Sequence, residues 1–161
     1  MSYSTRHPIV VTKPMNVAVV GGGKAALTKL KLILRNHSAV TCIAPEVSEK
    51  IRELPVSIRT ADFYDLSVSS YTNYSMIYLT LPYPETESER NYFEYVVSML
   101  MEQGKLVSVA SRPEMGNFIH PAVRYHEPYT VAVSSSGKNL YQSVAFADQF
   151  IAHIAGTVND E

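Results

Sequence analysis

A short apolar run that leads directly into three glycines constrains this chain more than any other feature. Val17–Val20 is entirely apolar, and Gly21-Gly22-Gly23-Lys24-Ala25-Ala26 follows it. In a Gly-x-Gly-x-x-Ala turn, the first glycine makes a tight turn and the second lets the backbone approach a pyrophosphate, while the small third residue lets the helix pack closely. The N-terminus of that helix offers free N–H groups to an anion. We therefore predict a dinucleotide-binding turn that includes Gly21, Gly23, Lys24, Ala25 and Ala26.

Strand and helix patterns alternate along the rest of the chain. The expected strands are Met15–Val20, Val40–Ala44, Val56–Arg59, Ser75–Leu81, Leu106–Ala110 and Tyr129–Val133, with Pro8–Val11 pairing at an edge. The expected helices are Lys24–Asn36, Glu46–Leu54, Glu85–Gln103 and Leu140–Ala155. Alternation of this kind predicts an α/β fold, a Rossmann-like doubly wound parallel sheet with strand order 3-2-1-4-5-6. Ligands bind such sheets where the strand order reverses, so Thr80 should border the same crevice as the glycines.

The end of the second strand bears on the choice of cofactor. An acidic residue there normally holds the ribose hydroxyls. Here the strand ends in Ala44-Pro45, and Glu46 follows one step later. Either Glu46 or backbone groups near Pro45 would hold the ribose. No arginine stands there for a 2′-phosphate, which favours NAD over NADP.

Composition excludes several classes of protein. The 161 residues have 46% hydrophobic and 18% charged residues, which is typical of one globular domain with at most a short appendage. A net charge of −1 argues against a nucleic-acid binder. The single cysteine, Cys42, cannot form an internal disulfide and fits a reducing compartment. With no apolar run near ~18 residues and no signal sequence before Lys13, we expect no membrane partner and a cytoplasmic location.

Further segments give the chain a family resemblance. They are Ser108–Ala122, which contains Ser-Arg-Pro-Glu and Asn-Phe-Ile-His-Pro-Ala, and Val131–Asn139, which contains Val-Ala-Val-Ser-Ser-Ser-Gly. His7-Pro8, Lys29, Val40–Pro45, Leu79-Thr80 and Asn91 add to the pattern. Together with the glycine turn, these segments resemble the siroheme-synthase family of NAD-dependent precorrin-2 dehydrogenases, some of which also insert iron. The resemblance implies a homodimer that transfers a hydride from precorrin-2, a tetrapyrrole with eight carboxylates, to NAD⁺.

The same resemblance assigns candidate site residues. Ser111 stands where the family has its catalytic aspartate, and His120 lies in the loop that would face the tetrapyrrole. A serine cannot act as a general base without help, so His120 is the candidate base or metal contact. The candidates for substrate binding are the polar residues Arg112, Asn117, Arg124, Ser135 and Lys138.

The resemblance also divides the chain and leaves its activity open. We expect an NAD-binding domain over residues 1–112 and a dimerisation segment with a terminal helix over 113–161, which is shorter than in the family. Because the aspartate is absent, two alternatives to a dehydrogenase stay open. One is a catalytically degenerate protein that binds NAD or a tetrapyrrole, and the other is a chelatase for sirohydrochlorin. The scattered histidines do not have the spacing of a metal site.

Overall fold

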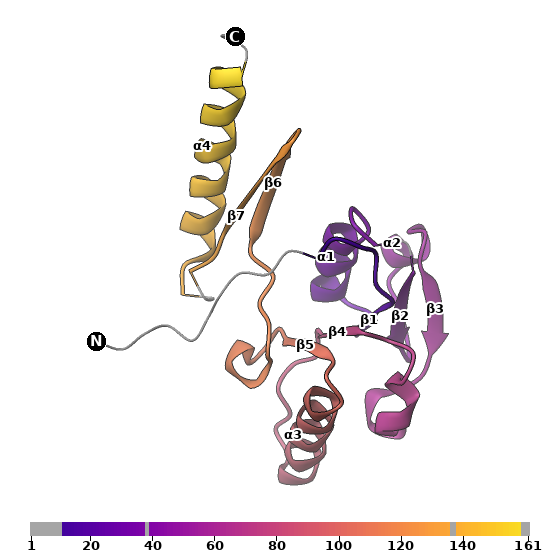
Figure 1. The fold of residues 1–161 in the computed structure, drawn as a ribbon. Coiled ribbons are helices and arrows are strands. Elements are labelled where there is room, and N and C mark those ends of the chain that lie inside the picture. Colours follow the sequence, from indigo (N-terminus) through magenta and orange to yellow (C-terminus); the bar gives the residue numbers. More distant parts are fainter. Residues whose placement is uncertain (1–10, 38, 136–137, 159–161) are drawn as a thin grey trace, which may run out of the picture.

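The computed structural model describes residues 11–37, 39–135 and 138–158. A layered α/β domain is followed by a hairpin and a long helix (Figure 1). The strands are β1 (Val17–Val20), β2 (Val40–Ala44), β3 (Ser57–Thr60), β4 (Met76–Leu79), β5 (Leu106–Val109), β6 (Ala122–His126) and β7 (Tyr129–Val133). The helices are α1 (Lys24–Ile33), α2 (Glu49–Arg52), α3 (Glu87–Glu102) and α4 (Leu140–Val158), with 3₁₀ turns η1 (Phe63–Asp65), η2 (Val68–Tyr71) and η3 (Pro113–Met115).

The first five strands form one parallel sheet in the order β3-β2-β1-β4-β5. β1 lies at its centre, with Val17 opposite Val40 on one side and Met76 on the other. The chain moves outward from β1 to β3 and then returns to place β4 on the opposite side. The strand order therefore reverses between β1 and β4, as the sequence predicts for a doubly wound sheet.

Each face of this sheet is covered by helix. Alternate residues of the strands point to opposite faces, so Val17 and Val19 join α1 and α2 in one apolar cluster. Ala18 and Val20 pack on the other face against α3, η1 and η2. All four residues of β1 are at most 1% exposed, which explains why its sequence is continuously apolar rather than alternating.

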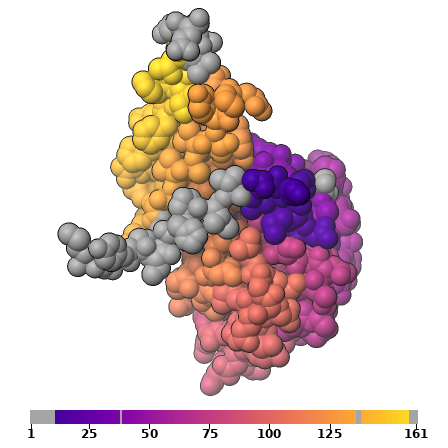
Figure 2. Space-filling model, in the orientation of Figure 1, coloured from indigo at the N-terminus to yellow at the C-terminus, as the bar shows by residue number. Residues whose placement is uncertain are grey.

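The chain after β5 builds a separate lobe. β6 and β7 pair antiparallel, with Ala122 opposite Val133, and α4 packs along both strands. Figure 2 shows this lobe, orange and yellow, projecting beyond the layered domain. A hydrogen bond of 3.0 Å from Asn36 Nδ2, just beyond α1, to Tyr125 Oη of β6 links the two parts.

The predicted sixth parallel strand, Tyr129–Val133, is wrong. This segment is β7 and pairs with β6 outside the main sheet, in a two-stranded antiparallel sheet. A parallel partner for β5 needs a crossover of a dozen or more residues, usually a helix. Only η3 and β6 lie between β5 and β7, and Glu127 and Pro128 leave just a tight turn before β7. The sequence reading also missed β6.

The other expected elements are present with shifted ends. Of the segment Glu46–Leu54 only Glu49–Arg52 is helical, and the helix predicted to reach Asn36 stops at Ile33. The last helix continues beyond the predicted Ala155 to Val158. The edge pairing expected for Pro8–Val11 lies, apart from Val11, outside the described residues. Among the helices of the described residues, none combines the length and apolarity needed to cross a membrane.

Candidate functional site

The carboxyl ends of β1 and β4 meet at the point where the strand order reverses. The Thr80 N–H and hydroxyl both donate to the carbonyl of Val20, at 2.9 Å and 2.7 Å. On the other side, the Gly21 N–H donates to the carbonyl of Ile43 at 2.9 Å. These bonds extend the strand ladder to the last residue of β1, so the glycine turn starts from a fixed point.

Two of the three glycines are required by close packing. Gly21 has φ of +122°, and a Cβ on it would lie 2.4 Å from Oγ1 of Thr80. A Cβ on Gly22 would lie 1.8 Å from the backbone oxygen of Glu46, and the carbonyl of Gly22 accepts from the N–H of Ser48 at 3.1 Å. The turn is therefore pressed against the chain that leaves β2. The sequence reading assigned no role to Gly22, because the close approach of Glu46 carries no separate signal.

Gly23 has open space beside it. No heavy atom of the described residues lies within 4 Å of a Cβ built there. Gly23 is the N-cap of α1, and among the described residues no side chain caps the helix and no acidic residue occupies its first turn. Lys24 and Ala25 are exposed, while Ala26 is 1% exposed and packs on β1. Uncapped N–H groups beside open space suit a pyrophosphate.

Pro45 and Glu46 lie at the neighbouring end of β2, and both are exposed. The structure thus brings Gly21, Thr80 and Glu46 together at one edge of the sheet. It leaves the Glu46 carboxylate in solvent, beside the turn that its own backbone contacts.

His120 contacts β4 through Tyr78, on the face of the sheet that α1 covers. Its Nδ1 is 3.0 Å from the hydroxyl of Tyr78, which is 2% exposed and also packs edge-on to Phe118. Burial lowers the pKa of His120 to about 4, and repulsion from Lys29 and His37 adds to the effect. Burial also raises the pKa of Tyr78, so near pH 7 both groups are neutral. Tyr78 donates to Nδ1 in one tautomer and accepts from it in the other, and only the second leaves Nε2 free to take a proton.

Ser111 and Arg112 follow β5 at the carboxyl edge. The Ala110 N–H still pairs with the carbonyl of Leu79 at 2.9 Å, and Ser111 is exposed just beyond it. Arg112 Nε lies 2.5 Å from Oε1 of Glu114. No described hydrogen bond joins Ser111 to His120, so the two candidate catalytic residues do not form a pair within the described chain.

The remaining candidates for substrate binding have local partners. Asn117 extends the edge of β5, because its side chain accepts from the N–H of Val107 at 2.7 Å and donates to the carbonyl of Lys105 at 2.8 Å. Arg124 Nε is 2.5 Å from Oδ1 of Asp148, which joins β6 to α4.

At the start of α4, the hydroxyl of Ser135 accepts from the N–H of Asn139 at 2.8 Å, while Lys138 is exposed. Gly137, in the same segment Val131–Asn139, lies outside the described residues. Within the described ranges, no group of three or more His, Cys, Asp and Glu residues could hold a metal ion.

Because the space beside Gly23 is open, a substitution there should affect stability and dinucleotide affinity in different ways. Asp is a favourable N-cap residue, so Gly23→Asp should leave the free energy of unfolding unchanged or raise it by a few tenths of a kcal/mol. Its carboxylate would occupy the anion position and lower the affinity for a dinucleotide by about tenfold or more. Urea unfolding and calorimetric titration with NAD⁺ measure the two effects. Unchanged affinity in a folded variant would remove α1 from the binding site.

Burial of His120 predicts a pH dependence of stability. The folded pKa lies below the unfolded value, so between about pH 6.5 and pH 4 the unfolded state binds more protons. Stability should therefore fall as the pH falls through this window, and the full linkage is at most roughly 3 kcal/mol. His120→Gln should lose less stability than the wild type between pH 6.5 and 4 in urea unfolding. Equal losses in both proteins would contradict the burial of His120.

Comparison with known proteins bears on the ligand of this site. Residues 9–122 match the model of a family described as "Putative NAD(P)-binding". The siroheme synthase of Nitrosococcus oceani is 32% identical over 123 residues, which cover 74% of this chain and 24% of that protein. The siroheme synthase of Psychrobacter cryohalolentis is 28% identical over 122 residues, covering 76% and 22%. The chain thus spans about a quarter of the length of these relatives.

A solved structure described as "SirC, precorrin-2 dehydrogenase" has the same fold. It superposes with a TM-score of 0.69 at 21% identity and covers 92% of this chain and 70% of its own. The family match covers well over half of the chain and includes the whole glycine turn and its surroundings. The chain belongs to this NAD(P)-binding family, and its predicted kinship with siroheme synthases is confirmed.

Proposed function

We propose that the protein is an NAD-dependent precorrin-2 dehydrogenase that produces sirohydrochlorin for siroheme biosynthesis. The observation that carries this proposal is the open, uncapped N-terminus of α1 behind a glycine turn at the reversal of the sheet. Kinship with siroheme synthases supplies the substrate class. The fold of a precorrin-2 dehydrogenase agrees with it.

The cofactor would be held mainly by backbone. The free N–H groups of Lys24 and Ala25 would bind the pyrophosphate, and Gly23 leaves room for it. Glu46 is exposed near the end of β2, where it can accept hydrogen bonds from ribose hydroxyls, and Pro45 sets the direction of the chain there. A carboxylate in this place disfavours a 2′-phosphate, which supports NAD over NADP. When bound, NAD⁺ supplies the hydride acceptor.

The substrate would lose a hydride and a proton and become sirohydrochlorin. Ser111, exposed at the end of β5, would hydrogen-bond the substrate edge. His120 would take the proton on Nε2, in the tautomer whose Nδ1–H donates to Tyr78. Because the pKa of His120 is lowered to about 4, its imidazole is neutral near pH 7, the form whose Nε2 has a free lone pair.

Cationic and polar side chains would receive the eight carboxylates of precorrin-2. Arg112 lies at the carboxyl edge of the sheet, and Arg124, Ser135 and Lys138 lie in the C-terminal lobe, which would approach the substrate of a partner subunit. Asn117 would act indirectly, since its amide is committed to β5. A reducing cytoplasm suits the buried free thiol of Cys42.

Residues 113–161 would form the contact of a homodimer. Among the described residues, the exposed large apolar side chains concentrate here, namely Tyr125, Tyr129, Leu140, Tyr141, Phe146 and Phe150. Tyr141 is 90% exposed and Phe150 is 53% exposed. Apolar side chains gathered on one lobe usually mark an interface.

The direct test is turnover. Purified protein with precorrin-2 and NAD⁺ should form NADH and sirohydrochlorin in equal amounts, followed by absorbance, and Gly23→Asp should slow the reaction about tenfold or more at subsaturating NAD⁺. Binding of NAD⁺ and of the tetrapyrrole without NADH formation would refute the enzyme and identify a catalytically inactive binding protein. Full turnover by His120→Gln across the pH profile would refute only the assignment of the base.

The homodimer has a separate test. The double variant Phe146→Asp/Phe150→Asp should sediment as a monomer while the wild type sediments as a dimer, because charges replace two apolar side chains of the interface. Gln149→Asp, which adds a charge to the same helix, serves as the control. A wild type that sediments as a monomer at micromolar concentration would contradict the proposal.

A further inference from the structure

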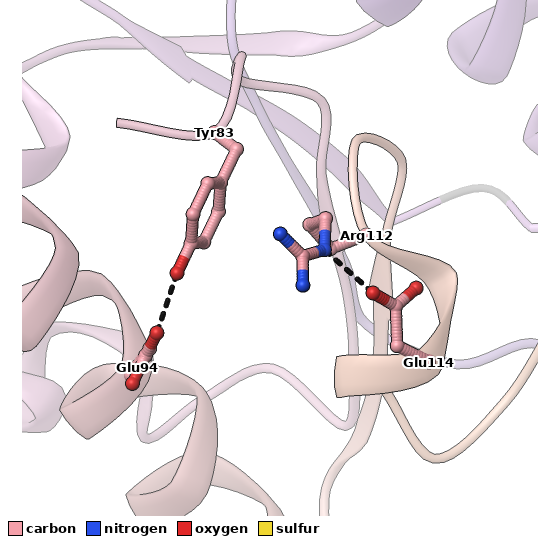
Figure 3. A network of polar contacts seen from close by, with 4 residues as sticks. All are labelled: Tyr83, Glu94, Arg112 and Glu114. Carbon is pink, nitrogen blue, oxygen red and sulfur yellow. Dashed lines mark hydrogen bonds and ion pairs between the residues drawn. The ribbon is translucent and has the colours of Figure 1, made fainter. Parts of the chain in front are cut away.

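Four polar side chains form a network at the carboxyl edge of the sheet, beside the proposed substrate crevice (Figure 3). Tyr83 comes from the loop after β4, Arg112 and Glu114 from the segment after β5, and Glu94 from α3. The guanidinium carbon of Arg112 lies 4.7 Å from the ring centroid of Tyr83. The network therefore joins the two loops that flank the edge.

Tyr83 and Glu114 hold the Arg112 guanidinium in different ways. Its central carbon lies over the Tyr83 ring, and that ring is fixed because its hydroxyl donates to Oε1 of Glu94 at 2.5 Å. A cation over an aromatic ring is attracted by the electrons of the ring and needs no carboxylate or carbonyl acceptor for this contact. Glu114 takes only Nε, and no other described residue accepts a hydrogen bond from Arg112. The terminal N–H groups stay available while the guanidinium is already positioned.

The hydrogen bond between Arg112 and Glu114 can be replaced by a bond from Arg112 to another acceptor. The Arg112 and Glu114 side chains are 48% and 61% exposed, and exposed ion pairs contribute little to stability. Glu114 is only two residues from Arg112, in the single turn of η3, so rotation of its side chain alone would release the arginine. The contact with the Tyr83 ring does not depend on Glu114 and would keep the guanidinium in place.

We propose that Glu114 is an internal stand-in for a substrate carboxylate on Arg112, and that Tyr83 holds the arginine ready for the exchange. A carboxylate of the tetrapyrrole displaces Glu114 from Nε and binds Nε and one terminal nitrogen with two parallel hydrogen bonds. Glu114 thereby lowers the affinity for ligands that cannot make this bidentate contact. The inference rests on the proposed function for its substrate class and adds Tyr83 and Glu114 as specificity-determining residues.

The test measures binding without turnover, with uroporphyrin as the probe, a planar tetrapyrrole with eight carboxylates. Glu114→Gln removes the competing carboxylate and should tighten uroporphyrin binding about three- to tenfold, while Arg112→Gln should weaken it by about tenfold. Glu53→Gln, which removes an exposed carboxylate beyond α2, controls for the change in net charge. Affinity for NAD⁺ should stay the same in all variants, which separates a carboxylate site from a phosphate site.

The double variant Arg112→Gln/Glu114→Gln decides the mechanism. If Glu114 acts through Arg112, the double variant should bind uroporphyrin as weakly as Arg112→Gln alone. Tyr83→Leu, which removes the ring, should weaken binding in the direction of Arg112→Gln.

Two results would overturn the proposal. In the first, Glu114→Gln and Glu53→Gln bind uroporphyrin with equal affinity. In the second, Glu114→Gln tightens uroporphyrin binding by the same factor whether Arg112 is present or replaced by Gln. Failure of the wild type to bind uroporphyrin would refute both the tetrapyrrole class and the stand-in. Loss of turnover with the predicted binding pattern intact would refute only dehydrogenation.

Discussion

At the carboxyl end of β1, the backbone of the glycine turn packs directly against the chain that leaves β2, and the rest of the structure depends on this contact. A side chain on Gly22 would collide with the carbonyl of Glu46, and one on Gly21 would collide with Thr80. Only glycines let the chains leaving β2 and β4 converge on the turn that leaves β1. This convergence fixes the start of α1 at the point where the strand order reverses, and it leaves the next residue, Gly23, uncovered.

The long helices differ at their N-termini in a way that fits this account. Thr86 caps α3 through the N–H of Glu89, and Asn139 accepts from the N–H of Gln142 at the start of α4. Among the described residues, α1 has no such side chain, although a cap typically contributes about 1 kcal/mol. The N–H groups left free are those that face the open space beside Gly23. A ligand that binds them would replace the missing cap.

Local patterns predicted the part of the fold in which neighbours in sequence are neighbours in space. The apolar run before Gly21 and the periodic helix after it predict β1 and α1 closely, since strand burial and helix periodicity are both local. The strand Tyr129–Val133 was assigned to the wrong sheet because its pattern carries no information about its partner. Alternating β-branched and aromatic residues in Ala122–His126 before Glu127-Pro128 were the signal that could have identified the hairpin.

The candidate site, like the fold, could be predicted from the sequence only where it depends on local motifs and strand order. The residues of the turn, and its proximity to Thr80, follow from the motif and the strand order. The pairing of Tyr78 with His120 and the cation–π contact of Arg112 with Tyr83 do not, because each joins side chains far apart in sequence whose directions depend on the packed fold. Burial in that fold keeps the candidate base His120 neutral, and the contact with Tyr83 positions Arg112. Neither effect can be predicted from a local motif, whereas the glycine turn can.

The central claim is that the uncapped start of α1 binds the dinucleotide. Amide chemical shifts of the isotope-labelled protein during a titration with NAD⁺ test it residue by residue. We expect the largest shifts at Gly23, Lys24 and Ala25, with little change at the capped start of α4 around Asn139. Shifts that spare residues 23–25, or that cluster at the start of α4 instead, would contradict the account.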